Sequence, residues 1–192
     1  MSRTLEERLN LILGRITSDE FLQNRGLGNE IGFWVFDYPP ERELDVRAFL
    51  DGTILPALGK RIPPMRAHKV DLFHLIMELL EERGLLDKVI QMQMDKGNEA
   101  VQAPLRSVLK EDKLARRIVQ QVDIDDIDMI ILTGVGAAYP MVRTNTLLSA
   151  LHPVMGNTPL LMFYPGRYDG YSLNLFSKMA DDHYYRAFRL VN

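Results

Sequence analysis

The chain alternates between segments with helical hydrophobic spacing and short, continuously apolar runs. Residues 3–16 have apolar positions three or four apart with Glu and Arg between them, which predicts an amphipathic helix that packs on the rest of the protein within residues 1–20. These apolar positions are Leu5, Leu9, Ile12, Leu13 and Ile16. Another helix is predicted to begin after Asp71, a residue type that caps helices, and to end at Arg83 before Gly84.

Prolines help to place the remaining helices. A helix is predicted from the two prolines at 39–40 to about Leu50, because proline fits the first turn of a helix. Residues 85–122 are expected to be mostly helical, and Pro104 is expected in the first turn of a helix rather than in an interior. A shorter helix is predicted over residues 144–151.

Three short apolar runs predict β-strands, and helices separate them in the sequence. The runs are residues 31–36, 129–132 and 159–163. Residues 68–71 fit either a strand or a loop, 172–179 fit either a helix or a strand, and 184–191 suggest an edge strand. Strands that alternate with helices indicate a parallel sheet. We therefore expect one α/β domain over residues 1–192, with a small, mainly parallel sheet flanked by helices.

The composition excludes several kinds of functional site. The 192 residues are 46% hydrophobic and 26% charged and include no cysteine, which excludes disulfides, thiolate metal ligands and cysteine nucleophiles. The formal net charge of −3 does not favour nucleic acid as a partner of the whole molecule, although a local basic patch is compatible with one. No apolar run approaches about 18 residues and no signal-peptide pattern is present, so we expect a cytoplasmic protein without a membrane span.

Two of the predicted strands lead into loops rich in glycine and arginine, one over residues 134–143 and one over 166–170. The carboxyl edge of a parallel sheet is where α/β proteins usually place their sites, so these loops are the first place to look for function. The candidates for binding a partner or an anion are Asp37, Tyr38, Arg143, Arg167, Asp169 and Arg186.

The glycines of the first loop do not match a nucleotide-binding motif. A Walker A loop requires a Gly-Lys-Ser/Thr string that the chain lacks, and a dinucleotide fingerprint requires a third glycine where Tyr139 stands. A tight strand-to-helix turn is the favoured interpretation of Gly134 and Gly136.

The charged candidates allow more than one interpretation. Arg143 precedes a helix start and could form an anion pocket there, or it could be an ordinary surface arginine paired with a carboxylate. Arg167 and Asp169 could pair with each other. The four histidines have no metal-ligand spacing and the chain has no Gly-x-Ser-x-Gly motif, so we expect no metal, no cofactor and no catalytic residue.

Of seven aromatic residues that could form a stacking platform with the arginines, five fall on predicted strands or at their edges. Core packing is favoured for them over a stacking platform for a ligand. The seven are Trp34, Phe36, Phe163, Tyr164, Tyr184, Tyr185 and Phe188.

The motifs resemble those of the BrxB family, the small component B of BREX bacteriophage-exclusion systems. The resemblance rests on Thr-Gly-Val-Gly and Tyr-Pro-x-Val-Arg within 133–143, Phe-Tyr-Pro-Gly-x-Tyr-x-Gly at 163–170, and Tyr-Tyr-Arg-Ala-Phe-Arg-Leu at 184–190. Residues 36–39 and the helix over 71–84 agree with it, so it covers nearly the whole chain. Asn145 stands where the family pattern leads us to expect His, so a role that needs an imidazole there is not carried over.

The resemblance implies a cytoplasmic defence protein rather than a stand-alone enzyme. The family works with a large ATPase, a DNA methyltransferase and a phosphatase-superfamily protein of the PglZ type, and no catalytic residue is established for this component. We therefore expect a non-catalytic scaffold or adaptor that binds a larger BREX protein. The PglZ-type protein is the first choice of partner and the ATPase is the second.

The C-terminal loops and the last strand are expected to form the interface, so charge reversal at Arg143 or Arg186 should abolish co-purification with the partner. The alternative is a degenerate nucleotide- or nucleic-acid-binding module in the same defence system. That module would bind ATP, GTP or short DNA and lose the binding in Arg143→Ala.

Overall fold

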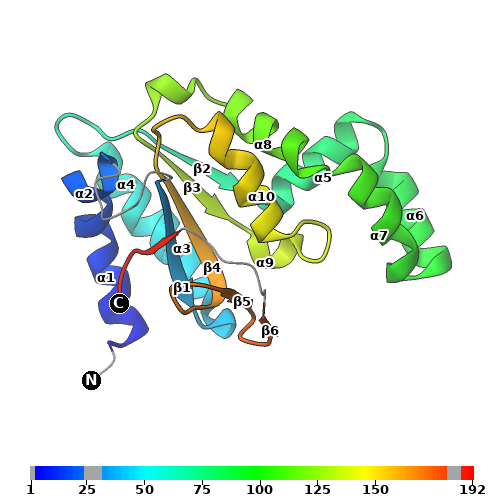
Figure 1. Cartoon of the computed structure of the whole chain (residues 1–192), viewed down its shortest axis with the longest axis horizontal. Coiled ribbons are helices and arrows are strands. Elements are labelled where there is room, and N and C mark those ends of the chain that lie inside the picture. Colours follow the sequence, from blue (N-terminus) through cyan, green and yellow to red (C-terminus); the bar gives the residue numbers. More distant parts are fainter. Residues whose placement is uncertain (1–2, 24–31, 181–186) are drawn as a thin grey trace.

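A parallel β-sheet with helices on both faces forms the body of the protein (Figure 1). The structure is a computed structural model that describes residues 3–23, 32–180 and 187–192. In spatial order the parallel strands are β2 (Ala67–Asp71), β3 (Met129–Thr133), β4 (Leu160–Tyr168), β1 (Phe33–Tyr38) and β7 (Phe188–Arg189). Two short antiparallel strands, β5 (Leu173–Leu175) and β6 (Met179–Ala180), continue from β4. The predicted α/β class with a mainly parallel sheet is confirmed.

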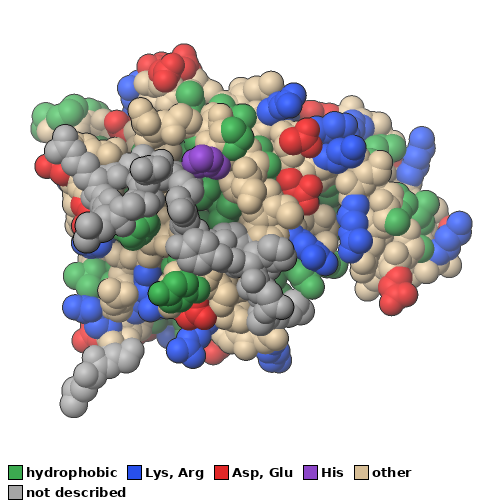
Figure 2. All heavy atoms as spheres, viewed as in Figure 1, with side chains coloured by type: hydrophobic (Ala, Val, Ile, Leu, Met, Phe, Trp, Pro, Cys, Tyr) green, Lys and Arg blue, Asp and Glu red, His purple; other side chains and the backbone are tan. Residues whose placement is uncertain are grey.

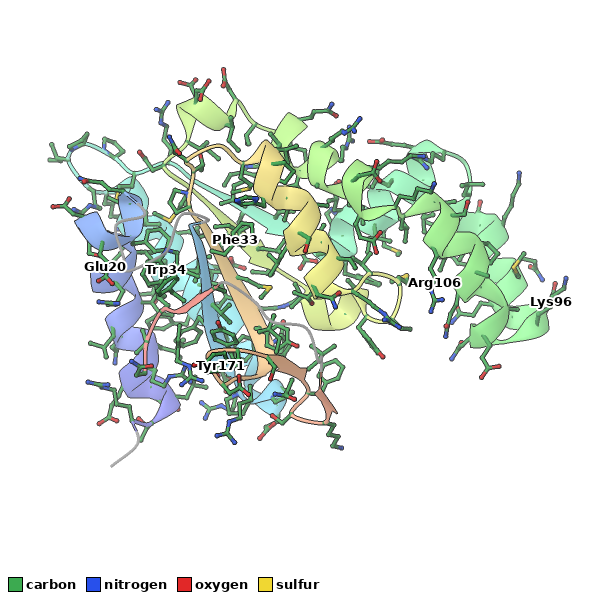
Figure 3. All side chains as sticks on the ribbon, viewed as in Figure 1. Glu20, Phe33, Trp34, Lys96, Arg106 and Tyr171 are labelled. Atoms are coloured by element: carbon green, nitrogen blue, oxygen red, sulfur yellow. The ribbon has the colours of Figure 1, made fainter. Side chains whose placement is uncertain are left out.

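One face of the sheet packs against helices from the first third of the chain. They are α1 (Leu5–Ile16), α2 (Asp19–Leu22), η1 (Pro40–Arg42), α3 (Glu43–Phe49), the π-helical η2 (Leu50–Ile54) and α4 (Leu55–Gly59). Thr4 and Glu7 form a capping box that begins α1, which satisfies amides that have no partner at a helix start. The apolar stripe of α1 is buried with Trp34, whose side chain points from β1 toward this face (Figure 3).

The other face packs against α5 (Leu72–Glu82), α8 (Glu111–Gln120), α9 (Val135–Ala138) and α10 (Thr144–Leu151), and α7 (Asn98–Val108) joins the same core through Val101 and Leu105. Helix α6 (Leu86–Lys96) pairs with α7, and the two project beyond the sheet as a helical hairpin (Figure 1), called the arm below. Phe33 joins the core of this face, opposite to Trp34, because successive side chains of a strand point to opposite sides.

The local helix signals are confirmed where they are strongest. The Asp71 carboxylate accepts a hydrogen bond from the backbone N–H of His74 and caps α5, and Gly84 takes a positive φ of 61° just after that helix. The prediction for Pro104 is wrong, because this residue lies inside α7. The helix break falls at Gly97 instead, which puts Pro104 well past the first turn, at an exposed position.

Several strand boundaries differ from the prediction. Strand β1 extends to Tyr38, and β4 extends to Tyr168, so much of the expected loop over 166–170 is strand. Pro165 lies where β4 turns from pairing with β3 and β1 to pairing with β5, a position that proline tolerates. The undecided residues 68–71 belong to β2, and the undecided residues 172–179 form the hairpin of β5 and β6.

Gly134 makes the predicted tight turn between β3 and α9. Its φ of 72° lies in the left-handed region, and a Cβ placed there would be 2.3 Å from Asp71 Oδ1. Any side chain would therefore meet both backbone strain and a steric clash with the residue that caps α5.

We expect Gly134→Ala to lower the free energy of unfolding by at least about 1–2 kcal/mol. Gly14→Ala is the matched control, because Gly14 is exposed within α1 and a Cβ there has nothing within 4 Å. The control should raise the stability by roughly 0.5–1 kcal/mol. Urea unfolding followed by circular dichroism measures both changes, and two changes of the same sign would contradict this account of the turn.

Candidate functional site

Strands β1 and β4 are neighbours whose following segments leave toward opposite faces of the sheet. After β1 the chain continues into α3 and α4, which pack on the face of Trp34, whereas after β4 it continues into β5, whose leucines pack in the core of the other face. Open α/β sheets bind ligands outside the carboxyl ends of the strands at such a point. A cleft of about 710 Å³ lies there, which we call the switch-point cleft.

The switch-point cleft brings together three of the six residues that the sequence suggested. Its polar lining includes Asp37, Tyr38, Glu41, Arg167, Ser177 and Lys178. The strand ends supply the first two and Arg167, and the turn after β5 supplies Ser177 and Lys178. Arg8 enters the cleft from α1, a contribution that no local sequence signal indicated.

Asp37 is the most heavily engaged residue of the cleft and is only 7% exposed. Its Oδ1 accepts a hydrogen bond from Arg8 Nη2 at 2.6 Å, and its Oδ2 accepts one from the backbone N–H of Tyr168 at 3.0 Å. Arg189 Nη2 lies 3.6 Å from the same Oδ2. Both oxygens are therefore engaged, and Asp37 joins α1, β1, β4 and β7.

Tyr38 is buried and also structurally engaged. Its hydroxyl donates a hydrogen bond to Glu43 Oε2, and Glu43 Oε1 is 2.8 Å from Arg47 Nε. Burial, together with the Glu43 carboxylate, raises the pKa of Tyr38 well above its ordinary value. The hydroxyl therefore stays protonated at physiological pH and holds the end of β1 to the start of α3.

Arg167 and Asp169 do not pair with each other. The Asp169 carboxylate accepts hydrogen bonds from the backbone N–H groups of Ser172 and Tyr171 and from the Ser172 hydroxyl, and these bonds lower the pKa of Asp169 to about 2. Asp169 thus stabilises the turn between β4 and β5. Arg167 is exposed at the switch-point cleft and has no polar partner among the residues that the structure describes.

Of the remaining two candidates, the structure describes only Arg143. Arg143 is exposed, precedes α10 and does not line the switch-point cleft. Its side chain has no polar partner within the described part of the chain, so the predicted surface ion pair is not found there. Arg186 lies outside the described residues.

A second hollow, which sequence reasoning missed, lies on the arm. This arm groove, of about 450 Å³, is formed by α5, α6, α7 and the loop after α9. Its apolar lining includes Phe73, Met77, Val89, Ile90, Leu105 and Met141. The helical spacing of apolar residues in α6 was a usable signal, but that spacing does not reveal that none of the residues of α6 is buried.

The described residues contain no group of three or more His, Asp or Glu side chains placed to hold a metal ion. None of the helices found in residues 3–23, 32–180 and 187–192 is long and apolar enough to cross a membrane.

Comparison with known proteins gives one consistent result. A family model described as BREX protein BrxB matches residues 68–190. A BREX protein BrxB from Escherichia coli O9:H4 (strain HS) is 47% identical over 190 residues, which cover 97% of this chain and 92% of that protein. A BREX protein BrxB from Bacillus cereus (strain H3081.97) is 41% identical over 194 residues, which cover 99% of each chain. No solved structure matches.

We expect Asp37→Asn to lower the free energy of unfolding by about 3 kcal/mol, because it leaves the partly buried guanidinium of Arg8 without its charged partner. Asp45→Asn is the control, since the ion pair of Asp45 with Arg42 is solvent-exposed and such pairs contribute at most about 1 kcal/mol. Chemical denaturation measures both losses. A loss at Asp37 no larger than the loss at Asp45 would show that the buried ion pair is not a main stabilising contact.

The Asp169 turn should weaken only in strong acid. The folded pKa of about 2 lies below the ordinary aspartate pKa of about 3.9, so this carboxylate contributes its full stability above roughly pH 4 and loses it as the pH falls toward 2. A carbon-detected NMR titration of the Asp169 carboxyl group should give a midpoint near 2. A midpoint near 4 would mean that the bonds to Ser172 and Tyr171 are not held in solution.

Proposed function

The chain belongs to the BrxB family, and on this premise we propose that it is a non-catalytic adaptor that docks a larger BREX protein. Membership makes it a component of a BREX phage-defence system. The PglZ-type protein is our first choice of partner and the BREX ATPase is the second. The observation that carries the proposal is the apolar surface that the arm leaves exposed.

Helix α6 has an amphipathic sequence but buries none of its residues. Ile90 is 45% exposed and Phe73 is 37% exposed at the arm groove, and Met94 on the same helix is 76% exposed. Each apolar side chain of this size left in water forgoes up to about 1.5–3 kcal/mol of burial free energy. Contiguous exposed apolar surface of this kind is typical of a site that a protein partner covers.

The chemistry of the arm groove suits a helix of the partner. Its polar lining consists of the uncharged side chains of Gln93, Asn98 and Gln102, which can hydrogen-bond to a partner without the cost of burying a charge. Met77 and Met141 add flexible thioethers that adapt to an incoming surface. An amphipathic helix laid into a hydrophobic groove is a common recognition mode with these features.

The arm is also accessible. Its two helices extend away from the sheet, and Lys96 lies at its far end, where α6 turns into α7 (Figure 3). Arg143 follows Met141 by two residues, so this sequence-predicted interface residue is close in the chain to the arm groove rather than to the switch-point cleft.

The switch-point cleft supports the non-catalytic part of the proposal. Its buried carboxylate, Asp37, is held between two arginines and a backbone amide. Its tyrosine hydroxyl remains protonated and is bonded to Glu43. Neither group is free to transfer a proton or attack a substrate, because each is already committed to holding the fold.

We expect Ile90→Glu to abolish co-purification of the protein with the PglZ-type partner when the two are co-expressed, because a carboxylate buried in the arm groove would be unpaired. Leu44→Glu is the matched control. Leu44 is 77% exposed on α3, far in the fold from the arm, and this variant should still bind. Arg143→Glu should weaken the complex less than Ile90→Glu, as a change beside the groove.

Circular dichroism and thermal unfolding should show that all three variants are folded. Complex formation by Ile90→Glu at the level of Leu44→Glu would rule out the arm groove as the docking site. Loss of the complex in Leu44→Glu alone would indicate that the interface lies on the opposite face of the sheet.

A further inference from the structure

We infer that the switch-point cleft binds a small phosphate-bearing molecule of nucleotide size, with Arg167 and Lys178 as its charged contacts. The inference is independent of docking through the arm groove, because none of the residues that line one hollow lines the other. It also places anion binding at a different arginine from Arg143, around which the sequence suggested it.

Position and size are the first argument. The cleft opens at the carboxyl ends of β1 and β4, where the connections leave to opposite faces of the sheet, and this is the usual ligand position in open α/β folds. Its volume of about 710 Å³ falls inside the range of about 300–1,000 Å³ that small-molecule sites occupy.

Charge is the second argument. The molecule carries a formal net charge of −3, yet cationic side chains outnumber carboxylates at this cleft. The Asp37 carboxylate is already offset by Arg8 and by Arg189 behind it. The side chains of Arg167 and Lys178 have no polar partner in the described part of the chain, and the exposed Glu41 is the cleft carboxylate that remains to oppose them.

Figure 2 shows several separate Lys and Arg side chains, with Asp and Glu side chains among them, along the lower edge of the molecule, which is the edge where β1 and β4 end in Figure 1. A cleft with low-dielectric walls concentrates the field of such groups, so a local excess of positive charge attracts anions even on a protein of negative net charge. Arginine is well suited to a phosphate group because its planar guanidinium can donate two parallel hydrogen bonds.

The backbone of the turn after β5 is the third argument. Phe176 and Ser177 have φ values of 54° and 56°, a left-handed conformation that glycine or asparagine adopts at much lower cost. Strained residues of this kind are concentrated at functional sites. The turn places Phe176, Ser177 and Lys178 on the cleft, and the half-buried Phe176 side chain packs against the core and so anchors the turn there.

A nucleic acid fits the cleft less well than a small ligand. Protein–DNA contacts use basic residues along a track, and each phosphate contact adds to the affinity. Arg167 and Lys178 are a compact pair instead, enough for one phosphate-bearing group. Short single-stranded DNA is therefore the competing ligand class that the experiment has to reject.

The test is isothermal titration calorimetry of the full chain with inorganic pyrophosphate, ATP and GTP, with a 20-nucleotide single-stranded DNA in parallel. At least one of the three small probes should bind with one-to-one stoichiometry and a micromolar Kd. Arg167→Ala and Lys178→Ala should each raise that Kd at least tenfold. Both side chains are exposed, so neither variant should change the thermal unfolding midpoint.

Arg143→Ala is the matched control and should leave the Kd unchanged, because Arg143 does not line the cleft. Three outcomes would overturn the inference. The first is that no small probe binds at millimolar concentration, and the second is that Arg167→Ala and Lys178→Ala bind the probe as tightly as the unsubstituted protein does. The third is that only the single-stranded DNA binds. None of these outcomes would affect the docking proposal, which depends on Ile90 and the arm groove.

Discussion

The fold depends on how one buried carboxylate is satisfied. Asp37 lies at the end of β1 and is held by Arg8 of α1, by the amide of Tyr168 at the end of β4, and by Arg189 of β7. An unpaired carboxylate at this depth would cost several kcal/mol, so the stability of the ends of β1 and β4 depends on both the N-terminal helix and the C-terminal strand. This single group thus connects the two ends of the chain across the central strands.

Different residues hold the fold together and remain exposed for binding. The strand ends, where an α/β enzyme would keep its reactive groups, are occupied by the bond of Asp37 with Arg8 and the bond of Tyr38 with Glu43, which hold the fold together. What stays available to other molecules lies further out: the cationic rim formed by Arg167 and Lys178, and the apolar arm built from α6 and α7. A body stabilised in this way can present a binding surface at its periphery, which is what an adaptor requires.

Features of the fold that depend on neighbouring residues could be predicted from the sequence. Features that depend on contacts between residues far apart in the chain could not. The cap at Asp71 and the turn at Gly134 were readable because each depends on a few neighbours. The prediction that Pro104 lies in the first turn of a helix was wrong because the helix begins just after Gly97. The helix preferences of proline do not indicate that earlier start. The role of Asp37 was not readable, since its partners lie 29 residues before it and 131 residues after it. The arm groove was missed for a related reason: the spacing in α6 indicates an apolar face, but only the packed structure shows that this face is left partly exposed.

Hydrogen–deuterium exchange on the protein alone and in complex with the PglZ-type BREX protein tests the adaptor account most directly. The account predicts slower amide exchange over α6 and the loop of residues 139–143 in the complex, with exchange in β1 and β4 unchanged. Protection confined to other elements, with α6 exchanging as fast in the complex as in the free protein, would contradict it.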